Sequence, residues 1–191
     1  MLVQEAIKSR RSVGRVKPDP VDRALIEAIL EAAVYAPNHY LTEPWRFFVM
    51  TGEGRQVLGR AYAEIAREKM KDEGSRGGEE FLNKQEAKAF RAPVVIAVAA
   101  SPSEVKPVIH VEELAAVHAA VQNMLLTAHA LGLGAIWRSG EPMYHPTMKQ
   151  AFGLQEREEM VGLIYIGYPE MIPTSVRQLT YADKTVWIDQ E

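Results

Sequence analysis

The chain has 191 residues, of which 47% are hydrophobic and 25% charged, and its formal net charge is −3. This balance is typical of one globular domain and gives no overall attraction to nucleic acid or to anionic membranes. The absence of cysteine excludes disulfides, thiolate nucleophiles and cysteine-ligated metal centres. The first residues lack the pattern of a signal peptide and no apolar run is long enough to span a membrane, so we expect a cytoplasmic protein.

The hydrophobic pattern predicts helices interspersed with a few short strands. In chain order, helices are expected at 3–8, 21–34, 55–71, 79–90, 112–131 and 146–152, and strands at 45–50, 94–100, 161–167 and, peripherally, 185–188. The strands at 94–100 and 161–167 are apolar throughout, which indicates burial on both faces. The helix at 112–131 is apolar on nearly all sides, which indicates a core or an interface. So few strands favour an α+β fold over a doubly wound one.

A cluster of cationic and hydroxyl side chains follows the first predicted helix, at Ser9-Arg10-Arg11-Ser12-Val13-Gly14-Arg15. A guanidinium group matches a phosphate with two hydrogen bonds, each worth roughly 1.5–3 kcal/mol when charge-assisted. Arg10, Arg11 and Ser12 therefore form a candidate phosphate clamp. The residues alone are equally consistent with a solvated basic patch.

A second segment, Gly134-Ala135-Ile136-Trp137-Arg138-Ser139-Gly140, follows the long apolar helix. Read as a glycine-bracketed loop, it would let its backbone approach a flat ligand and donate an N–H to a heteroaromatic nitrogen. Read as a helix end followed by a strand, it would place Trp137 in the core, and the segment by itself favours this second interpretation. A loop here, combined with the phosphate clamp, predicts a planar, phosphate-bearing cofactor and hence a redox enzyme.

A third segment, Ala36-Pro37-Asn38-His39-Tyr40, forms a polar turn whose Asn38 and His39 could bind a ligand, although such residues more often cap helices and turns. The histidines show no metal-ligand spacing, so no metal site is expected. The sequence also lacks the nucleophile elbow, the phosphate loop and the Rossmann glycine pattern. Ordinary hydrolases, nucleoside triphosphatases and Rossmann dehydrogenases are therefore disfavoured.

Taken together, the motifs at 9–12, 36–49, 92–93 and 134–140 resemble the FMN-dependent nitroreductase family, and most closely its small NAD(P)H nitroreductase branch. The resemblance covers about residues 3 to 170. It implies a single FMN-binding domain over 1–191, built as a three-layer α+β sandwich with a central, mostly antiparallel sheet flanked by helices. It also implies an intertwined homodimer with FMN at the interface and the helix at 112–131 in the dimer core.

The resemblance assigns roles to individual residues of this chain. Residues expected to bind FMN are Arg10, Arg11 and Ser12 at the phosphate and ribityl chain, Trp137, Arg138 and Ser139 along the isoalloxazine ring, and Tyr35, Asn38 and His39 from the other subunit. Close relatives carry Arg where this chain has Tyr35. A backbone N–H near Arg138 and Ser139 is expected beside flavin N5, and no side chain is expected to be catalytic.

Two further segments receive expected roles. The polar, glycine-rich stretch at 72–78 and the helix after it form an expected mobile lid over 72–90, in which Phe81 touches substrate or core and Phe90 belongs to the core. The C-terminal arm at 177–191 is expected to reach the partner, with Arg177 or Lys184 near the phosphate.

The implied chemistry is a ping-pong transfer of hydride from NADH or NADPH, through flavin N5, to a small oxidant such as a nitroaromatic or a quinone. Two alternatives remain open: an FMN store or sensor without turnover, and a flavin-free interaction module built on the long apolar helix. The sequence chooses neither the nicotinamide donor nor the oxidant.

Overall fold

The computed structural model describes residues 1–191 apart from 73–77, 106, 172, 174–179 and 189–191. Within the described chain, four strands form one antiparallel sheet in the order β1-β2-β4-β3. Their bounds are β1 Trp45–Thr51, β2 Val94–Ala100, β3 Gly134–Arg138 and β4 Glu159–Gly167. The predicted central, antiparallel sheet is confirmed.

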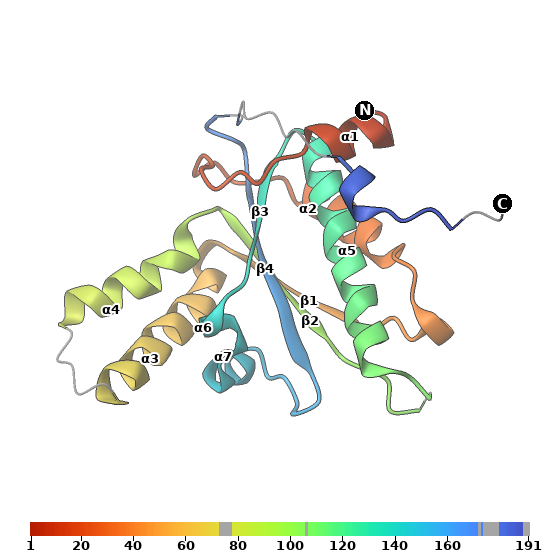
Figure 1. Cartoon of the computed structure of the whole chain (residues 1–191). Coiled ribbons are helices and arrows are strands. Elements are labelled where there is room, and N and C mark those ends of the chain that lie inside the picture. The colour runs from red at the N-terminus through yellow and green to blue at the C-terminus, as the bar shows by residue number, and fades with distance from the viewer. Residues whose placement is uncertain (73–77, 106, 172, 174–179, 189–191) are drawn as a thin grey trace.

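Helices cover both faces of this sheet, so that the molecule has three layers (Figure 1). One outer layer contains α1 (Val3–Ser9), α2 (Arg23–Val34) and α5 (His110–Ala130). The other contains α3 (Gln56–Asp72), α4 (Glu79–Glu86), α6 (Glu141–Tyr144) and α7 (Pro146–Ala151). Short 3-10 turns lie at His39–Leu41, Gly52–Arg55, Ala87–Phe90 and Ala182–Lys184. The predicted α+β three-layer architecture is therefore confirmed.

Strand β2 divides the hydrophobic core into two halves, because successive side chains of a strand point to opposite faces. Ile96 and Val98 belong to the cluster packed against α2 and α5, whereas Val95 and Ala97 belong to the cluster packed against α3 and α7. Every residue of β2 is buried. The uninterrupted apolar run at 94–100 thus has the two-sided burial that the sequence indicated.

Helices α2 and α5 pack against each other in one outer layer. Ile29 of α2 and Met124 of α5 are fully buried between them, and Asn123 donates a side-chain hydrogen bond of 3.1 Å to the carbonyl of Ala32. The chain reverses just after α5, where Gly132 has a φ of +79°, a conformation that side chains disfavour. The helix expected at 112–131 is α5, which begins about half a turn earlier than predicted, at His110, and ends at Ala130, close to the expected end.

Two local predictions about the periphery are wrong. Residues 185–188 form no strand, and Val186 and Ile188 are 85% and 94% exposed, because no described strand edge lies beside them. Phe90, expected in the core, is 36% exposed and lies against the Arg55 guanidinium at 4.8 Å, while the smaller Ala89 takes the buried position.

The helix expected at 79–90 is α4 followed by a 3-10 turn, and α4 packs against α3. Of the expected lid, residues 73–77 lie outside the described residues, as does Arg177 of the expected arm. Lys184 is described, and its exposed ammonium group pairs with the neighbouring Asp183 at 2.8 Å.

Candidate functional site

The two segments singled out in the sequence lie side by side. The Val13 N–H donates a 3.0 Å hydrogen bond to the Ala135 carbonyl, along the outer edge of β3. A Cβ at Gly134 would lie 2.8 Å from a methyl carbon of Val13, so glycine permits this close approach. Further along, the Arg138 guanidinium lies 3.6 Å from where a side chain at Gly14 would begin. Sequence positions more than 120 residues apart thus form one surface.

The cationic segment surrounds the last turn of α5. Arg11 donates hydrogen bonds of 2.8 and 3.0 Å to the carbonyls of Lys8 and Arg10, which hold its side chain near α1. His129 approaches the Ser9 hydroxyl at 2.7 Å. Burial, followed by the charges of Arg10 and Arg11, lowers the pKa of His129. The imidazole is therefore neutral at neutral pH, and the local positive charge resides on the two arginines.

Residues 134–138 form strand β3, which confirms the interpretation as a helix end followed by a strand that the segment by itself favoured. They pair with β4 from Gly134 opposite Gly167 to Arg138 opposite Leu163. The loop interpretation is wrong for these residues because the edge of β4 satisfies their backbone groups. Only Ser139 and Gly140 leave the sheet, and Gly140 has a φ of +114°.

The strand geometry sends neighbouring side chains of β3 into different layers. Trp137 is half-buried on the α5 side, where its indole N–H donates to the Val161 carbonyl at 3.2 Å and its ring lies 5.6 Å from that of His118. Arg138 points to the other face, with its guanidinium 5.5 Å from the centre of the Tyr165 ring. The two predicted ligand-binding side chains therefore serve opposite faces of the sheet.

Arg138 enters a cavity of about 430 Å³ between β3, α3 and the turn after α4. Its polar lining consists of Tyr62, Lys88, Arg91, Trp137, Arg138, Ser139 and Tyr165. The Nε of Arg138 is buried and has no hydrogen-bond partner among the described residues. Burial raises the pKa of Tyr62 and that of Tyr165, and the neighbouring Tyr62 adds to the shift of Tyr165. Both phenols therefore remain neutral donors at neutral pH.

Sequence reasoning missed Lys88, Arg91, Tyr62 and Tyr165 as members of this cavity. The two cations stand three residues apart, just before the apolar run at 94–100, and this was the only available signal. The tyrosines come from α3 and β4 and carry no local signature.

His39 lies far from the cationic segment within one protomer. His39 approaches the carboxylate of Glu112 at 3.2 Å, near the start of α5, whereas His129 and the arginines lie at its end. At 1.5 Å per residue, these two ends of α5 are about 25 Å apart. Tyr35 follows α2 and is 78% exposed. One protomer therefore does not bring His39 to the clamp.

The turn that carries His39 is strained and firmly anchored. Tyr40, Leu41 and Glu43 have φ values of 56°, 53° and 47°, each a conformation that costs about 1–3 kcal/mol without glycine. The Asn38 side chain accepts a 3.0 Å hydrogen bond from the Glu43 N–H. The Thr42 hydroxyl donates at 2.7 Å to Glu113, which is buried in α5. These contacts hold the turn in one conformation.

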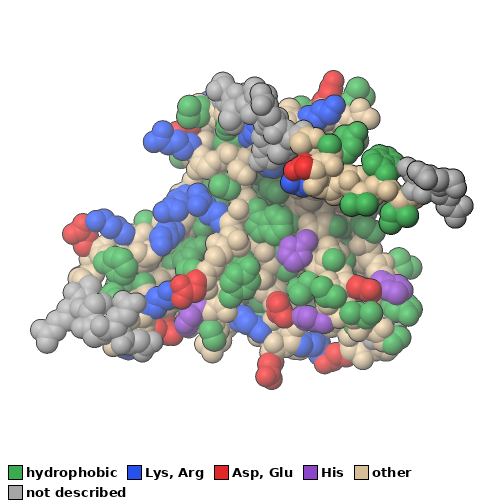
Figure 2. All heavy atoms as spheres, in the orientation of Figure 1, with side chains coloured by type: hydrophobic (Ala, Val, Ile, Leu, Met, Phe, Trp, Pro, Cys, Tyr) green, Lys and Arg blue, Asp and Glu red, His purple; other side chains and the backbone are tan. Residues whose placement is uncertain are grey.

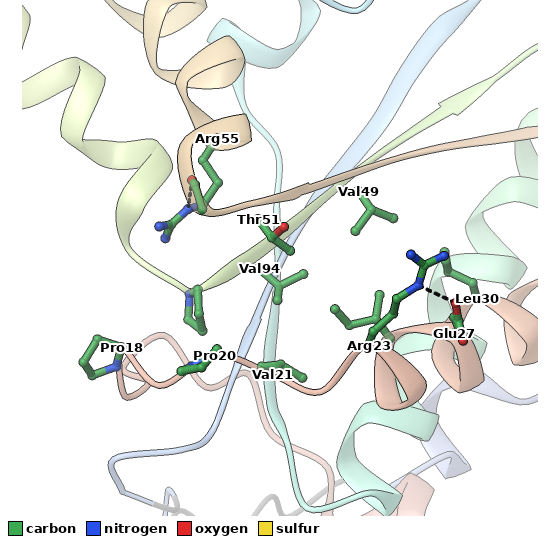
Figure 3. Close-up of a pocket in the computed structure, with 13 residues that line it drawn as sticks. Pro18, Pro20, Val21, Arg23, Glu27, Leu30, Val49, Thr51, Arg55 and Val94 are labelled. Carbon is green, nitrogen blue, oxygen red and sulfur yellow. Dashed lines mark hydrogen bonds and ion pairs between the residues drawn. The ribbon is translucent and has the colours of Figure 1, made fainter.

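The structure has a second, larger cavity of about 740 Å³, between residues 18–21, α2 and the outer edge of β1 (Figure 3). Its lining is mainly apolar and includes Val21, Leu30, Val49 and Val94, with the exposed Arg23–Glu27 ion pair of 2.7 Å at its side. None of the residues predicted from sequence to bind a ligand lines it.

The position of Trp137 depends on the absence of a side chain at Gly162. A Cβ there would lie 2.3 Å from the indole nitrogen. We expect Gly162→Ala to lower the free energy of unfolding by about 1–3 kcal/mol, as overpacking does, and to change the near-ultraviolet circular dichroism of the tryptophans. Gly54→Ala is the control, because no atom lies within 4 Å of its added Cβ. Equal stability of the two variants would show that Trp137 adapts freely.

Within the described residues, no helix is long and apolar enough to cross a membrane. No group of three His, Asp or Glu side chains in that part of the chain is placed to hold a metal ion.

Comparison with known proteins identifies the family. The nitroreductase family model matches residues 7–168. YfhC of Bacillus subtilis, named as an NAD(P)H nitroreductase, is 33% identical over 184 residues, covering 96% of this chain and 92% of the relative. YdjA of Escherichia coli, with the same name, is 34% identical over 168 residues, covering 87% and 88%.

Solved structures agree with this assignment. A nitroreductase-like protein from Bacillus cereus is 29% identical, with a TM-score of 0.81, and the match covers 100% of this chain and 97% of the other. A nitroreductase from Desulfovibrio desulfuricans, solved in complex with FMN, is 28% identical, with a TM-score of 0.75 and coverage of 100% and 99%. The resemblance found in the motifs is confirmed, and the chain belongs to the nitroreductase family.

Proposed function

We propose that the protein is an FMN-dependent oxidoreductase that uses NADH or NADPH to reduce a small organic oxidant, such as a nitroaromatic or a quinone. The observation that carries this proposal is the contact between the Arg10–Arg15 segment and β3, which joins a phosphate clamp to a cationic cavity. The FMN complex of a 28% identical relative and the NAD(P)H nitroreductase names of two others support it.

The described residues offer the donor groups that FMN would need, and they are spaced closely enough for one FMN molecule to contact them. Arg10, Arg11 and Ser12 would hold the phosphate through guanidinium and hydroxyl donors. Trp137, Arg138 and Ser139 would lie along the ring, where the orphaned Nε of Arg138 supplies a donor in need of an acceptor. Arg10 and Gly14, which touches Arg138, are at most about 14 Å apart along an extended chain. A phosphate and a flat ring joined by a short chain can therefore occupy the clamp at Arg10–Ser12 and the site beside Arg138 at the same time.

When bound, FMN would supply the redox chemistry, taking a hydride at N5 from NADH or NADPH and passing two electrons to the oxidant in a ping-pong cycle. The chain's own residues would position the flavin ring and polarise it. The backbone N–H groups near Arg138 and Ser139 would donate hydrogen bonds to the ring, and the nearby positive charges favour the form that carries extra electrons. The neutral hydroxyl of Tyr62 can donate a hydrogen bond without moving a proton.

Completion of this site requires a second copy of the chain. Because His39 lies about 25 Å from the clamp along α5 within one protomer, we assign it, together with the neighbouring Tyr35 and Asn38, to the site of a partner in a homodimer. The hydrogen bond from Thr42 to Glu113 holds the turn that carries His39 in one conformation. A residue that contacts a partner subunit benefits from being held in this way. The C-terminal arm, including Lys184, and a lid over 72–90 are part of the same proposal, as is a cytoplasmic location.

A visible absorption spectrum of the purified protein, before and after anaerobic addition of NADH or NADPH, tests this function. We expect a yellow protein that bleaches with at least one nucleotide and recovers its colour when a quinone or a nitroarene is added. A yellow protein that neither nucleotide bleaches would instead be an FMN store or sensor. A colourless protein that cannot be reconstituted with FMN would contradict the cofactor assignment.

A further inference from the structure

The 430 Å³ cavity beside β3 concentrates positive charge beyond what the phosphate clamp needs. Lys88, Arg91 and Arg138 all line it, and in the part of the chain that the structure describes none of its lining residues is Asp or Glu. Figure 2 shows lysine and arginine side chains gathered beside the end of α4. The cavity is thus a cationic site on the α3–α4 side of the sheet, distinct from Arg10 and Arg11.

Among the described residues, the cations in this cavity have no anionic partner. No ion pair between described residues involves Lys88, Arg91 or Arg138. Lys88 donates only to the neutral side chain of Gln85 and lies 5.8 Å from the Tyr62 ring centre. Burial, followed by the charge of Arg91, lowers the pKa of Lys88, so keeping this ammonium group charged, partly buried and beside a second cation costs free energy. A bound anion would relieve that cost.

FMN alone leaves part of this charge unmatched. The phosphate of FMN is assigned to Arg10, Arg11 and Ser12, and the ring carries at most one negative charge when it is reduced. Three cations line the cavity, and Arg138 is the one that adjoins the Gly14 segment. Lys88 lies in the 3-10 turn after α4, and Arg91 is the residue that ends this turn.

We propose that Lys88 and Arg91 bind a carboxylate carried by the oxidant, so that the preferred substrates are small aromatic acids with a reducible group. This inference rests on the proposed function, whose oxidant it specifies. A guanidinium group can hold a carboxylate through two parallel hydrogen bonds, and an adjacent ammonium adds a third donor. The neutral hydroxyl of Tyr62 completes the set, and Tyr165 gives the cavity an aromatic wall.

The test compares two substrates that differ only in charge, 4-nitrobenzoate and its methyl ester, in the FMN-loaded protein. We expect the wild type to favour the acid. Arg91→Gln and Lys88→Met should each lower kcat/KM for the acid about tenfold, which is what the loss of one charge-assisted hydrogen bond amounts to, and change kcat/KM for the ester less than about twofold. Lys84→Met is the matched control, since Lys84 pairs with Glu80 and does not line the cavity.

A binding measurement makes the test independent of turnover. Benzoate has no reducible group, and its titration into the protein by calorimetry should give a Kd about tenfold weaker in Arg91→Gln, while neutral benzamide shows no such difference. If the protein reduces no oxidant, the proposed function fails, and the benzoate titration still decides whether the cavity takes carboxylates.

Three results would overturn the inference. One is a wild type that neither favours the acid nor binds benzoate. Another is an equal loss for acid and ester in Arg91→Gln together with weaker sulfite binding to the flavin, which would assign the cations to the ring. The third is an increase in KM confined to NADH or NADPH, which would assign them to the phosphates of the donor.

Discussion

Arg10→Ala is expected to yield a protein that folds but has lost most of its FMN. Removing one guanidinium from the phosphate removes one or two charge-assisted hydrogen bonds, so FMN affinity should fall about 10- to 100-fold. The variant should still reach the wild-type rate of flavin reduction at saturating FMN, because Arg10 holds the phosphate and does not touch the reacting ring. The ratio of flavin to protein absorbance, followed by FMN titration of the stripped protein, measures the effect.

Arg15→Ala provides the control for this experiment, because it removes the same kind of charge from the same segment. The Arg15 side chain is exposed, and its backbone carbonyl accepts a hydrogen bond of 3.2 Å from the Glu170 N–H, which alanine preserves. We expect near-normal FMN content in Arg15→Ala. Full FMN occupancy in Arg10→Ala would show that the phosphate lies elsewhere and that the Arg10–Ser12 cluster is a basic surface patch.

Arg46→Met should destabilise the fold more than any loss of an exposed ion pair. The Glu158 carboxylate is only 2% exposed and accepts hydrogen bonds of 2.7 and 2.8 Å from Arg46 and 2.8 Å from the Gln155 N–H. Removing the cation leaves a buried charge without its partner, which costs about 3–5 kcal/mol in a fully buried pair. Because Arg46 is 39% exposed, we expect about 2 kcal/mol in urea unfolding at neutral pH.

The pH dependence of this difference distinguishes the ion pair from lost packing. Burial tends to raise the pKa of Glu158, but the hydrogen bonds from Gln155, Arg46 and Ser101 and the charge of Arg46 outweigh it, so the pKa in the folded protein lies below the usual value of 4.5. The ionised Glu158 therefore contributes to stability above pH 4.5. This contribution is lost as the pH falls through the lowered pKa that Glu158 has in the folded protein. The difference in free energy of unfolding between wild type and Arg46→Met should therefore become smaller at acid pH.

Arg23→Met is the matched control, because Arg23 and Glu27 form an exposed pair one helical turn apart. Such pairs contribute little, so we expect no measurable change in stability at any pH. If the loss of stability in Arg46→Met is the same at neutral and at acid pH, the Arg46 side chain stabilises the fold through its packing on Phe48. Its guanidinium lies 5.0 Å from the centre of that ring.

The parts of the fold that were predictable are those in which local pattern and tertiary burial agree. The apolar run at 94–100 matches a strand buried on both faces, and the alanine-rich helix at 112–131 is apolar on nearly all sides. The strand at 134–138 was ambiguous because its glycines and Trp137 suit a loop as well as an edge strand. Only the pairing with β4 decides between them, and that contact depends on residues nearly thirty positions away.

The parts of the candidate site differ in how far a local sequence pattern can identify them. Arg10–Ser12 and 134–140 each have a local signature, and the structure brings these two segments into contact. The cavity that they border was not predictable, because Tyr62, Lys88 and Tyr165 come from three different elements, and none of them has a motif of its own. The charge of the cavity emerges only from their packing.

The alternation along β3 has an evolutionary consequence. Trp137 belongs to the layer built by α5, which we assign to dimerisation, and Arg138 to the layer built by α3 and α4, which we assign to choice of oxidant. Substitutions in one layer can accumulate without disturbing the other, so substrate range can drift while assembly is conserved. An insertion or deletion of a single residue in β3 would exchange the two faces at once. Divergence of such proteins should therefore proceed by substitution in this strand, with changes of length confined to the loops on either side.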